Sequence, residues 1–281
     1  MRLISYRHQG LTSYGVVRDA GIVDCARLAG APPTVKALLE AGTVDEVASL
    51  SAGRDPDVRI EDVEVLPPVL DAGKVLCTGL NYHTHREETD RPKVDYPTVF
   101  IRFADTHVGH EQPILRPPVS ESLDYEGELA VVIGKPGFRV DVATAMDHVA
   151  GYSCYDDASV RDWQRHTSQW TPGKNFPATG GFGPWLVTAD EIDDPGALEL
   201  TTRVNGDVRQ NASVSELIFS IPELIAYMSA FTALRPGDVI VTGTPGGVGA
   251  FRDPPVFLGS GDIVEVEISQ VGLLRNRIDQ G

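Results

Sequence analysis

Alternating apolar and polar residues are the dominant pattern along this chain, and they predict a protein built mainly of β-strands. Neighbouring side chains of a strand point to opposite faces, so alternation marks a strand with one buried face. Residues 1 to about 66 contain two such runs, RLISYR and SYGVVRD. From Lys74 onward the strand patterns dominate: KVLCTG, TVFIRF, ELAVVIG, HVAGYSCY, ALELTTRV, DVIVTG and DIVEVEIS. A mainly β (α+β) fold with a few peripheral helices is expected, because no alternation of strand and helix persists.

Helical patterns are few. Residues 34–51 (TVKALLEAGTVDEVASLS) have helical spacing, with a break expected at Gly42. Two further helices are predicted in VATAMDHV and in SELIFSIPELIAYMSAFTAL, where Pro222 starts a new helical turn or kinks the helix. The pair Asn205-Gly206, between LELTTRV and VRQ, is typical of a two-residue β-hairpin turn.

A proline-rich stretch indicates where the chain divides. The segment VLPPVLDAGK contains Pro67 and Pro68 and is typical of a linker. We therefore expect a small N-terminal domain over residues 1–68 and a catalytic domain over residues 69–281.

The charge balance excludes two classes of partner. The chain has 281 residues and a formal net charge of −16. Nucleic acid is bound mainly through lysines and arginines on phosphates, and anionic lipid surfaces attract basic segments. Neither partner fits an acidic chain. A small acidic substrate is not excluded, because a bound metal ion or a few basic side chains can outweigh the distant field.

Three cysteines, Cys25, Cys77 and Cys154, are too few and too widely spaced for a disulfide framework or a zinc site, so buried reduced thiols are expected. The segment MRLISYRHQG has no apolar core of a secretory signal, and no run approaches the length of a membrane span. The cytoplasm is the expected compartment.

The most informative segment is LDYEGE, followed by the apolar strand LAVVIGK. Residues two apart lie on one face of a strand, so Glu126 and Glu128 project side by side. Two carboxylates this close repel each other unless a cation lies between them. A pair of glutamates at a solvated strand end is the alternative reading.

A second acidic group, YDDASVRDWQ, follows the next predicted strand. If a helix begins after Asp157, then Arg161 and Gln164 share its face, and Asp157 either caps that helix or points into a site. Three carboxylates leave room for waters and an oxygen-rich substrate in an octahedral shell, which favours Mg²⁺ or Mn²⁺ over zinc.

A third segment, GLNYHTHREETD, places His85 and Glu88 one helical turn apart. A carboxylate beside an imidazole orients it and raises its basicity, as a water-activating base requires. A solvated surface pair is the alternative. The polar residues 83–97 are expected to form a lid that is mobile without substrate.

Together, these segments resemble the fumarylacetoacetate hydrolase family, as do GKNF at 173–176, FSIPELI and VTGTPGGVG at 241–249. The resemblance runs in unbroken order over residues 70–277. It implies a distorted, mixed β-roll catalytic domain, a small N-terminal β-rich domain and a homodimer.

The family also implies roles for individual residues. The metal ligands would be Glu126, Glu128 and Asp157, and the lid dyad would be His85 and Glu88. The residues implied to face or line the substrate are Lys174, Arg161, Gln164, Thr244, Arg102 and Tyr82. Arg102 departs from the lysine of several relatives, and Thr78 stands where one member has an additional aspartate ligand.

The reaction expected from this resemblance is hydrolysis of a C–C bond in a 2,4-dioxo acid, an acylpyruvate or fumarylpyruvate, to pyruvate and a carboxylic acid. The alternatives are an isomerase or tautomerase of a 2-oxo acid and a decarboxylase of the oxaloacetate type, since all of them stabilise the same enolate. A catalytically silent metabolite-binding protein is a rival of another class, and the intact dyad argues against it.

Overall fold

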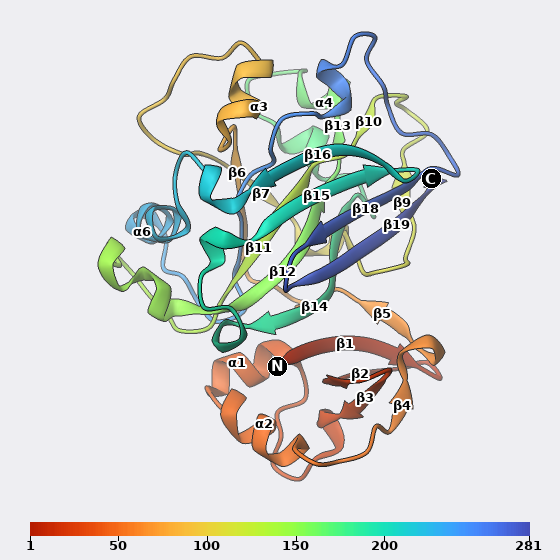
Figure 1. Cartoon of the computed structure of the whole chain (residues 1–281), viewed down its shortest axis with the longest axis vertical. Coiled ribbons are helices and arrows are strands. Elements are labelled where there is room, and N and C mark those ends of the chain that lie inside the picture. Colours follow the sequence, from red (N-terminus) through yellow and green to blue (C-terminus); the bar gives the residue numbers. More distant parts are fainter.

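A computed structural model describes all 281 residues, which form a small lobe and a larger body (Figure 1). The small lobe, at the bottom of Figure 1, contains a curved set of strands with two short helices beside it. Its strands are β1 (Arg2–His8), β2 (Leu11–Arg18), β3 (Gly21–Asp24), β4 (Val58–Arg59) and β5 (Glu64–Leu66), and its helices are α1 (Val35–Ala41) and α2 (Val44–Ser51).

The larger body is rich in strands, with short helices at its periphery. Its strands are β6 (Val75–Gly79), β7 (Thr98–Arg102), β8 (His107–Val108), β9 (Ile114–Arg116), β10 (Leu123–Asp124), β11 (Gly127–Ile133), β12 (Val149–Asp157), β13 (Ser159–Val160), β14 (Gly180–Thr188), β15 (Glu199–Val204), β16 (Asp207–Ser213), β17 (Val239–Val241), β18 (Ile263–Ile268) and β19 (Gly272–Gln280). Its α-helices are α3 (His83–Glu88), α4 (Arg161–Gln164), α5 (Thr171–Lys174) and α6 (Ile221–Phe231).

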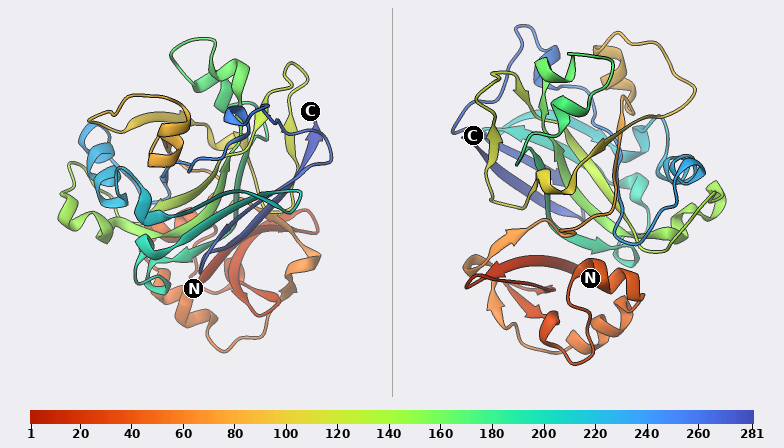
Figure 2. Two further views of the ribbon diagram at one scale, coloured as in Figure 1. Left: turned by 45° about the horizontal axis from the view of Figure 1, so that its top comes forward. Right: turned by 180° about the vertical axis from the view of Figure 1, so that it is seen from behind.

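One mixed sheet runs through both parts of the molecule. Its strand order is β4-β3-β2-β1-β14-β12-β11-β17-β6-β7, with β5 paired to β1 and β8 to β14. Most pairs are antiparallel, but β17 pairs with β6 in parallel. The lobe joins the body where β1 pairs with β14, with Leu3 opposite Leu186. A second sheet, β16-β15-β18-β19-β9, packs against the first, and Figure 2 shows the two layers from other directions.

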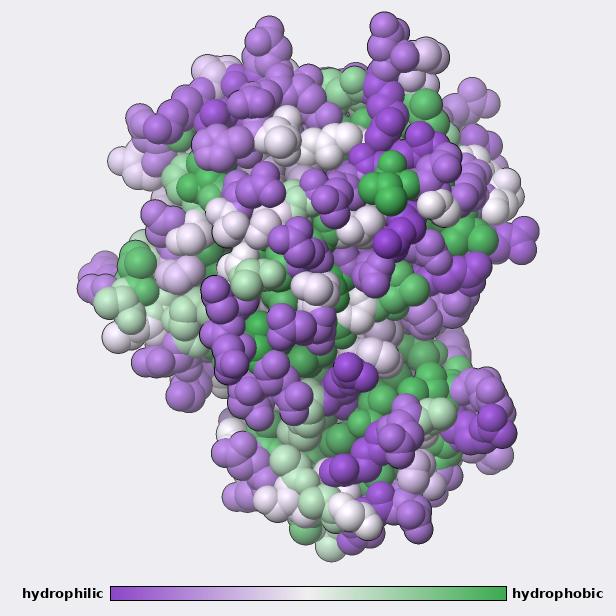
Figure 3. All heavy atoms as spheres, in the orientation of Figure 1, coloured by the Kyte–Doolittle hydropathy of each residue, from purple (hydrophilic) through white to green (hydrophobic).

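Two apolar cores hold these layers together. The larger lies between the two sheets and helix α6, and it includes Leu129, Leu200 and Leu224. The second core extends from Leu38 in the lobe to Phe182 in β14, so the lobe and the body share buried apolar surface. Figure 3 shows that hydrophilic residues cover most of the visible face, while apolar residues gather near the junction of lobe and body. The central strands β11 and β12 therefore pack against these apolar cores.

Most of the predicted local elements are present. The mainly β (α+β) fold is confirmed, and helix α1 ends before Gly42, whose φ of 67° is left-handed. Asn205 and Gly206, with φ of 55° and 85°, turn the hairpin between β15 and β16, and Pro222 lies in the first turn of α6. The prediction of an α-helix in VATAMDHV needs correction, because Val142–His148 forms a 3₁₀-helix.

The remaining short segments are 3₁₀-helices, and none is long. They lie at Cys25–Arg27, Ile60–Asp62, Ala104–Thr106, Ala189–Glu191, Pro195–Ala197, Val214–Glu216 and Gly249–Phe251. All three cysteines are free and buried, as the sequence predicts. The structure contains no helix with the length and apolar character needed to cross a membrane.

Candidate active site

Two neighbouring strands bring the predicted metal ligands together. Glu126 immediately precedes β11, Glu128 is the second residue of that strand, and Asp157 ends the antiparallel strand β12. The Asp157 amide donates to the Glu126 carbonyl, with N and O 2.9 Å apart, which fixes the two strand ends beside each other. Carboxylate oxygens of these three buried residues lie within 4.8 Å of one another. Such an oxygen-only set suits a hard divalent cation.

The electrostatics of the three carboxylates fit a bound cation. Burial raises the pKa of Glu128 well above its usual range, and the charges of Asp157 and Glu126 raise it further. Burial also disfavours the Glu126 carboxylate, but Arg161 and Lys174 beside it hold its pKa below the usual range. Only one oxygen of Glu128 is held by the backbone, through the amide of Gly243. The protein's own cations thus leave Glu128 undercompensated, and Mg²⁺ or Mn²⁺ would supply the missing charge.

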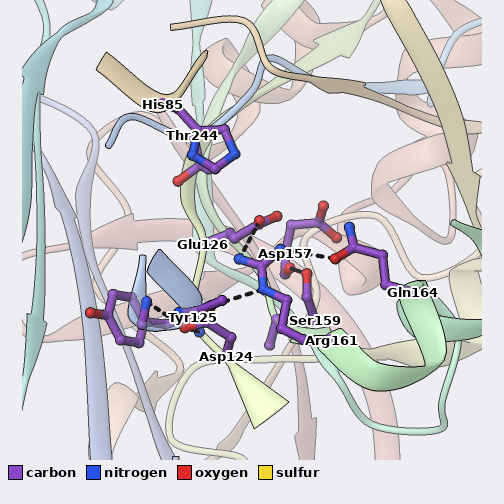
Figure 4. A network of polar contacts seen from close by, with 12 residues as sticks. His85, Asp124, Tyr125, Glu126, Asp157, Ser159, Arg161, Gln164 and Thr244 are labelled. Atoms are coloured by element: carbon purple, nitrogen blue, oxygen red, sulfur yellow. Dashed lines mark hydrogen bonds and ion pairs between the residues drawn. The ribbon is translucent and has the colours of Figure 1, made fainter. Parts of the chain in front are cut away.

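Lys174 and Arg161 connect the carboxylates to the cavity wall. The Lys174 ammonium donates to Glu126 and to Asp157, where Nζ and Oδ2 are 2.6 Å apart. Arg161 Nη2 lies 2.7 Å from Glu126 Oε1, and its Nη1 donates to Gln164 Oε1 at 3.0 Å. Figure 4 shows Arg161 between Glu126 and Gln164. The predicted residues Lys174, Arg161 and Gln164 therefore all meet at the carboxylates.

No helix begins directly after Asp157, so the reading of Asp157 as a helix cap is wrong. Asp157 is the last residue of β12, and Ser159 and Val160 pair with β10 before the short helix α4 begins at Arg161. Ser159 and Val160 are extended because they pair with β10 in a separate two-stranded sheet, and Ser159 Oγ donates to the Asp157 carbonyl. Asp157 consequently reaches the site from a strand end and caps no helix.

Arg102 and Tyr82 do not occupy the places expected for substrate contacts. Arg102 points inward from β7, where Nη1 lies 2.6 Å from Asp157 Oδ1 and Nη2 donates to Thr179. Tyr82 is fully buried just before α3. Neither lines the cavity. Arg102 instead forms an ion pair with Asp157 outside the cavity, because a buried carboxylate needs a fixed positive partner.

The His85–Glu88 dyad forms as predicted on α3. His85 Nδ1 and Glu88 Oε1 are 2.6 Å apart, and the Gly247 amide donates to the other carboxylate oxygen of Glu88 at 2.8 Å. Phe251 packs edge-on against the imidazole, with ring centroids 6.3 Å apart. Only 6% of His85 is exposed. In Figure 4 the imidazole faces the acidic cluster across the site.

The lid is attached at its start by the side chains of Asn81 and Thr84. The Asn81 amide donates to the carbonyls of Phe219 and Thr242, and its oxygen accepts from the Phe219 amide. Thr84 accepts a hydrogen bond from the Gly246 amide. The predicted mobility of residues 83–97 stays a prediction. Because Asn81 is anchored by three hydrogen bonds, a hinge for such a movement would have to follow Asn81 in the chain.

Between lid and strands lies a cavity of about 390 Å³. Polar side chains make up most of its wall. The predicted residues that line it are His85, Glu126, Glu128, Arg161, Gln164, Lys174 and Thr244, and further lining residues are Thr78, Arg91, Phe100, Arg165, Trp170 and Phe251. The Thr244 hydroxyl donates to the Gly127 carbonyl and accepts from Gln210, so it braces the strand between the two glutamates.

Several supporting residues escaped prediction. Asp124 accepts from Arg161 Nε at 2.8 Å and from the amides of Gly249 and Ala250. Gln210 accepts from the Gly127 amide. Asp124 lies two residues before Glu126, and that spacing could have indicated it, since alternate residues share a face. Gln210 belongs to a distant strand and has no local signal.

Comparison with known proteins identifies the family of this chain. The family described as "Fumarylacetoacetate (FAA) hydrolase C-terminal" matches residues 74–279. The chain is 40% identical over 290 residues to the mitochondrial oxaloacetate tautomerase FAHD2A of Bos taurus, covering 99% of this chain and 91% of that protein.

Solved structures agree over the full length. The fumarylacetoacetate hydrolase of Exiguobacterium antarcticum is 31% identical, with a TM-score of 0.85 and full coverage of both chains. The maleylpyruvate hydrolase of Sphingobium sp. SYK-6, in complex with manganese(II) and pyruvate, is 30% identical, with a TM-score of 0.83 and full coverage of both chains. This chain is therefore an enzyme that belongs to the fumarylacetoacetate hydrolase family.

Proposed function

We propose that the protein is a divalent-metal-dependent tautomerase that interconverts the enol and keto forms of a 2-oxo acid of the oxaloacetate type. The observation that carries the proposal is the His85–Glu88 dyad, which lines the same small cavity as two of three clustered carboxylates and Lys174. The 40% identity to a protein named oxaloacetate tautomerase supports this reaction over the C–C hydrolysis expected from the sequence. Hydrolysis thus becomes the second candidate.

The three carboxylates Glu126, Glu128 and Asp157 would hold Mg²⁺ or Mn²⁺. When bound, the ion supplies Lewis-acid chemistry, since it draws electron density from the 2-oxo group and weakens the neighbouring C–H bond. The manganese and pyruvate in the related maleylpyruvate hydrolase support this use of the site.

His85 moves the proton in this proposal. Its Nδ1 donates to Glu88, which leaves Nε2 to act in the cavity. In the keto-to-enol direction Nε2 takes a proton from C3, and the electron pair of that bond forms the C2–C3 double bond. The 2-oxo oxygen takes up a proton from solvent and becomes a hydroxyl, while His85 returns its proton to solvent. Lys174 supplies a hydrogen-bond donor for the oxygen as its charge grows.

Glu88 and the surrounding walls keep the base in place. The Gly247 amide orients Glu88, and Phe251 limits rotation of the imidazole. Both contacts hold the ring in one orientation before substrate arrives, which is the main structural contribution that a protein makes to general-base catalysis.

One observation favours hydrolysis as the second candidate. The cavity volume of about 390 Å³ exceeds what a four-carbon acid fills and leaves space for an acyl group and a water molecule. In that reaction His85 would take a proton from water, hydroxide would attack the C4 carbonyl of a 2,4-dioxo acid, and the C3–C4 bond would break.

A paired assay separates the two reactions. Enol oxaloacetate is followed by the loss of its ultraviolet absorbance, and acylpyruvates are followed by pyruvate release, each with Mg²⁺- or Mn²⁺-loaded protein. We expect enol decay about 10²-fold or more above the uncatalysed rate. Enol decay at the uncatalysed rate, together with stoichiometric pyruvate from an acylpyruvate, would refute the tautomerase and establish the hydrolase. Carbon dioxide release from oxaloacetate would reveal a decarboxylase.

The assembly and the compartment stay predictions. The family resemblance implies a homodimer, and light scattering that gives the mass of one chain at micromolar concentration would contradict it.

A further inference from the structure

Two arginines of the cavity wall have no role in the reaction proposed above. Arg91 lies beyond α3 in the lid segment, and Arg165 directly follows α4. Both are exposed and line the cavity that holds the carboxylates. They approach the same opening from two separate segments of the chain.

Aromatic rings connect each arginine to the catalytic groups. On one wall, the Lys174 ammonium lies 4.8 Å from the ring centroid of Phe100, which packs edge-on against Trp170 at 5.5 Å, and the Arg91 guanidinium lies 5.7 Å from the Trp170 ring centroid. On the other wall, Phe251 contacts His85, and the Arg165 guanidinium lies 5.7 Å from the Phe251 ring centroid. Aromatic side chains therefore separate each guanidinium from the catalytic groups, and each guanidinium lies over one of these rings.

The other cations of the cavity already have partners. Lys174 and Arg161 form ion pairs with Glu126, Asp157 and Asp124. Arg91 and Arg165 are absent from the ion pairs of the chain, and their guanidinium groups form no hydrogen bond within it. Two arginines without an ion pair therefore lie at the opening of one cavity.

We propose that Arg91 and Arg165 bind a second carboxylate of the substrate, so that the enzyme selects 2-oxo dicarboxylic acids over 2-oxo monocarboxylic acids. The inference rests on the proposed function, in which the first carboxylate and the 2-oxo group occupy the end of the cavity near Glu126 and Glu128. The rest of the carbon chain then lies between the aromatic walls, and its far end meets the arginines.

The chemistry of the opening matches such a substrate. A guanidinium binds a carboxylate through two parallel N–H···O bonds, and its weak hydration lowers the cost of pairing. Stacking on Trp170 and Phe251 reduces the side-chain freedom that each arginine loses on binding. An apolar tail at the same place would meet two uncompensated charges. Arg91 and Arg165 are thus specificity-determining residues.

Binding measurements test the proposal without relying on turnover. Each ligand pair has equal carbon number and differs in the distal carboxylate: 2-oxoglutarate against 2-oxopentanoate, and 2-oxoadipate against 2-oxohexanoate. Titration calorimetry of Mg²⁺-saturated protein gives the dissociation constants. We expect the dicarboxylate of at least one pair to bind about tenfold tighter, and this preference to shrink as salt is added.

Substitutions at the opening should act on this preference. Arg91→Ala and Arg165→Ala should each reduce it about three- to tenfold, mainly by weakening dicarboxylate binding, and Arg165→Lys should restore part of it. Arg139→Ala is the matched control, because Arg139 also stacks on an aromatic ring, Phe138, but lies outside the cavity. The control should keep the parent preference.

Two results would overturn the proposal. One is equal binding of both members of each pair by the parent protein. The other is an equal loss for both members in the arginine variants, which would indicate a structural role. Failure of the tautomerase assay with the dicarboxylate preference intact would instead refute the proposed reaction and leave the arginine assignment standing.

Discussion

The strands and the lid hold their functional groups in opposite ways. Glu126 and Asp157 are buried at strand ends of the central sheet and fixed by ion pairs with Arg102, Arg161 and Lys174, while the Gly243 amide holds Glu128. His85 lies on a six-residue helix whose contacts to the TGTPGG loop are a few hydrogen bonds. Buried charge requires partners set in advance, because leaving a charge unpaired costs several kcal/mol. His85 needs orientation more than charge compensation, and Glu88 and Phe251 supply that orientation.

The largest expected effect comes from replacing Glu128, a proposed metal ligand. Glu128→Gln should weaken Mg²⁺ or Mn²⁺ binding about 10²-fold or more and lower activity about 10⁴-fold, since the carboxylate charge is lost without a change of shape. Calorimetric titration with Mn²⁺ and the enol-decay assay give the two values.

The same variant should not destabilise the metal-free protein. Burial and the neighbouring carboxylates raise the pKa of Glu128, so its charged form opposes folding at neutral pH. The unfolding midpoint of metal-free Glu128→Gln should therefore equal or exceed that of the parent. A marked drop in this midpoint would mean that Glu128 is stabilised by contacts within the protein, which would count against its role as a metal ligand.

Next in size is the effect of the lid base. His85→Gln should lower turnover about 10²–10⁴-fold, the usual contribution of a general base, and should leave the Mn²⁺ dissociation constant unchanged, because His85 is no ligand. Activity within a few-fold of the parent would show that another group moves the proton. A decarboxylation activity, if present, should suffer less than tautomerisation or hydrolysis, because it needs neither a base nor an attacking water.

His107 should make the stability of the folded protein depend on pH. Burial, and to a lesser degree Arg102, lowers the pKa of His107 to about 3, and its Nε2 lies 2.6 Å from the Tyr155 hydroxyl. The unfolded chain takes up a proton near pH 6.5, whereas the folded protein does not, so stability is lost as pH falls from about 6.5 towards 3. Between pH 6.5 and 5 this loss is about 2 kcal/mol. His107→Gln should lack it, as urea unfolding at both pH values would reveal, and equal losses in both proteins would contradict the assignment.

The smallest expected effect is on the motion of the lid. Amide hydrogens of residues 83–97 should exchange with solvent faster than those of β11 and β12, because the lid is polar and carries few buried apolar residues. A bound 2-oxo acid should slow exchange in the lid about tenfold and leave the strands unchanged. Equal protection of lid and strands in the free protein would remove the distinction between the two regions.

The sequence predicts features that depend on neighbouring residues. The alternation of strands, the turn at Asn205-Gly206 and the end of α1 at Gly42 are all local, and the structure contains them. The pairing of β1 with β14 joins residues far apart in the chain, and no local pattern encodes it. The strand after Asp157 was missed for the same reason, since its partner β10 precedes it by more than thirty residues.

The residues of the site also fall into those that local spacing predicts and those that depend on distant strand pairing. Glu126 and Glu128 are two apart, and His85 and Glu88 are one turn apart, so their spacing alone suggests that they act together. The roles of Arg102 and Gln210 depend on which strands lie side by side. Arg102 has the residue type of a substrate contact, but the pairing of β6 with β7 turns its side chain inward to Asp157.

The pairing of β1 with β14 also makes the small lobe a protective cover. A chain shortened to begin after Leu66 would leave the β14 edge with unpaired backbone amides and carbonyls beside the apolar Leu186 and Val187. Exposed edges of this kind are templates for intermolecular strand addition. The lobe thus covers an edge that would otherwise be open to strand addition from another copy, although it contributes no residue to the cavity.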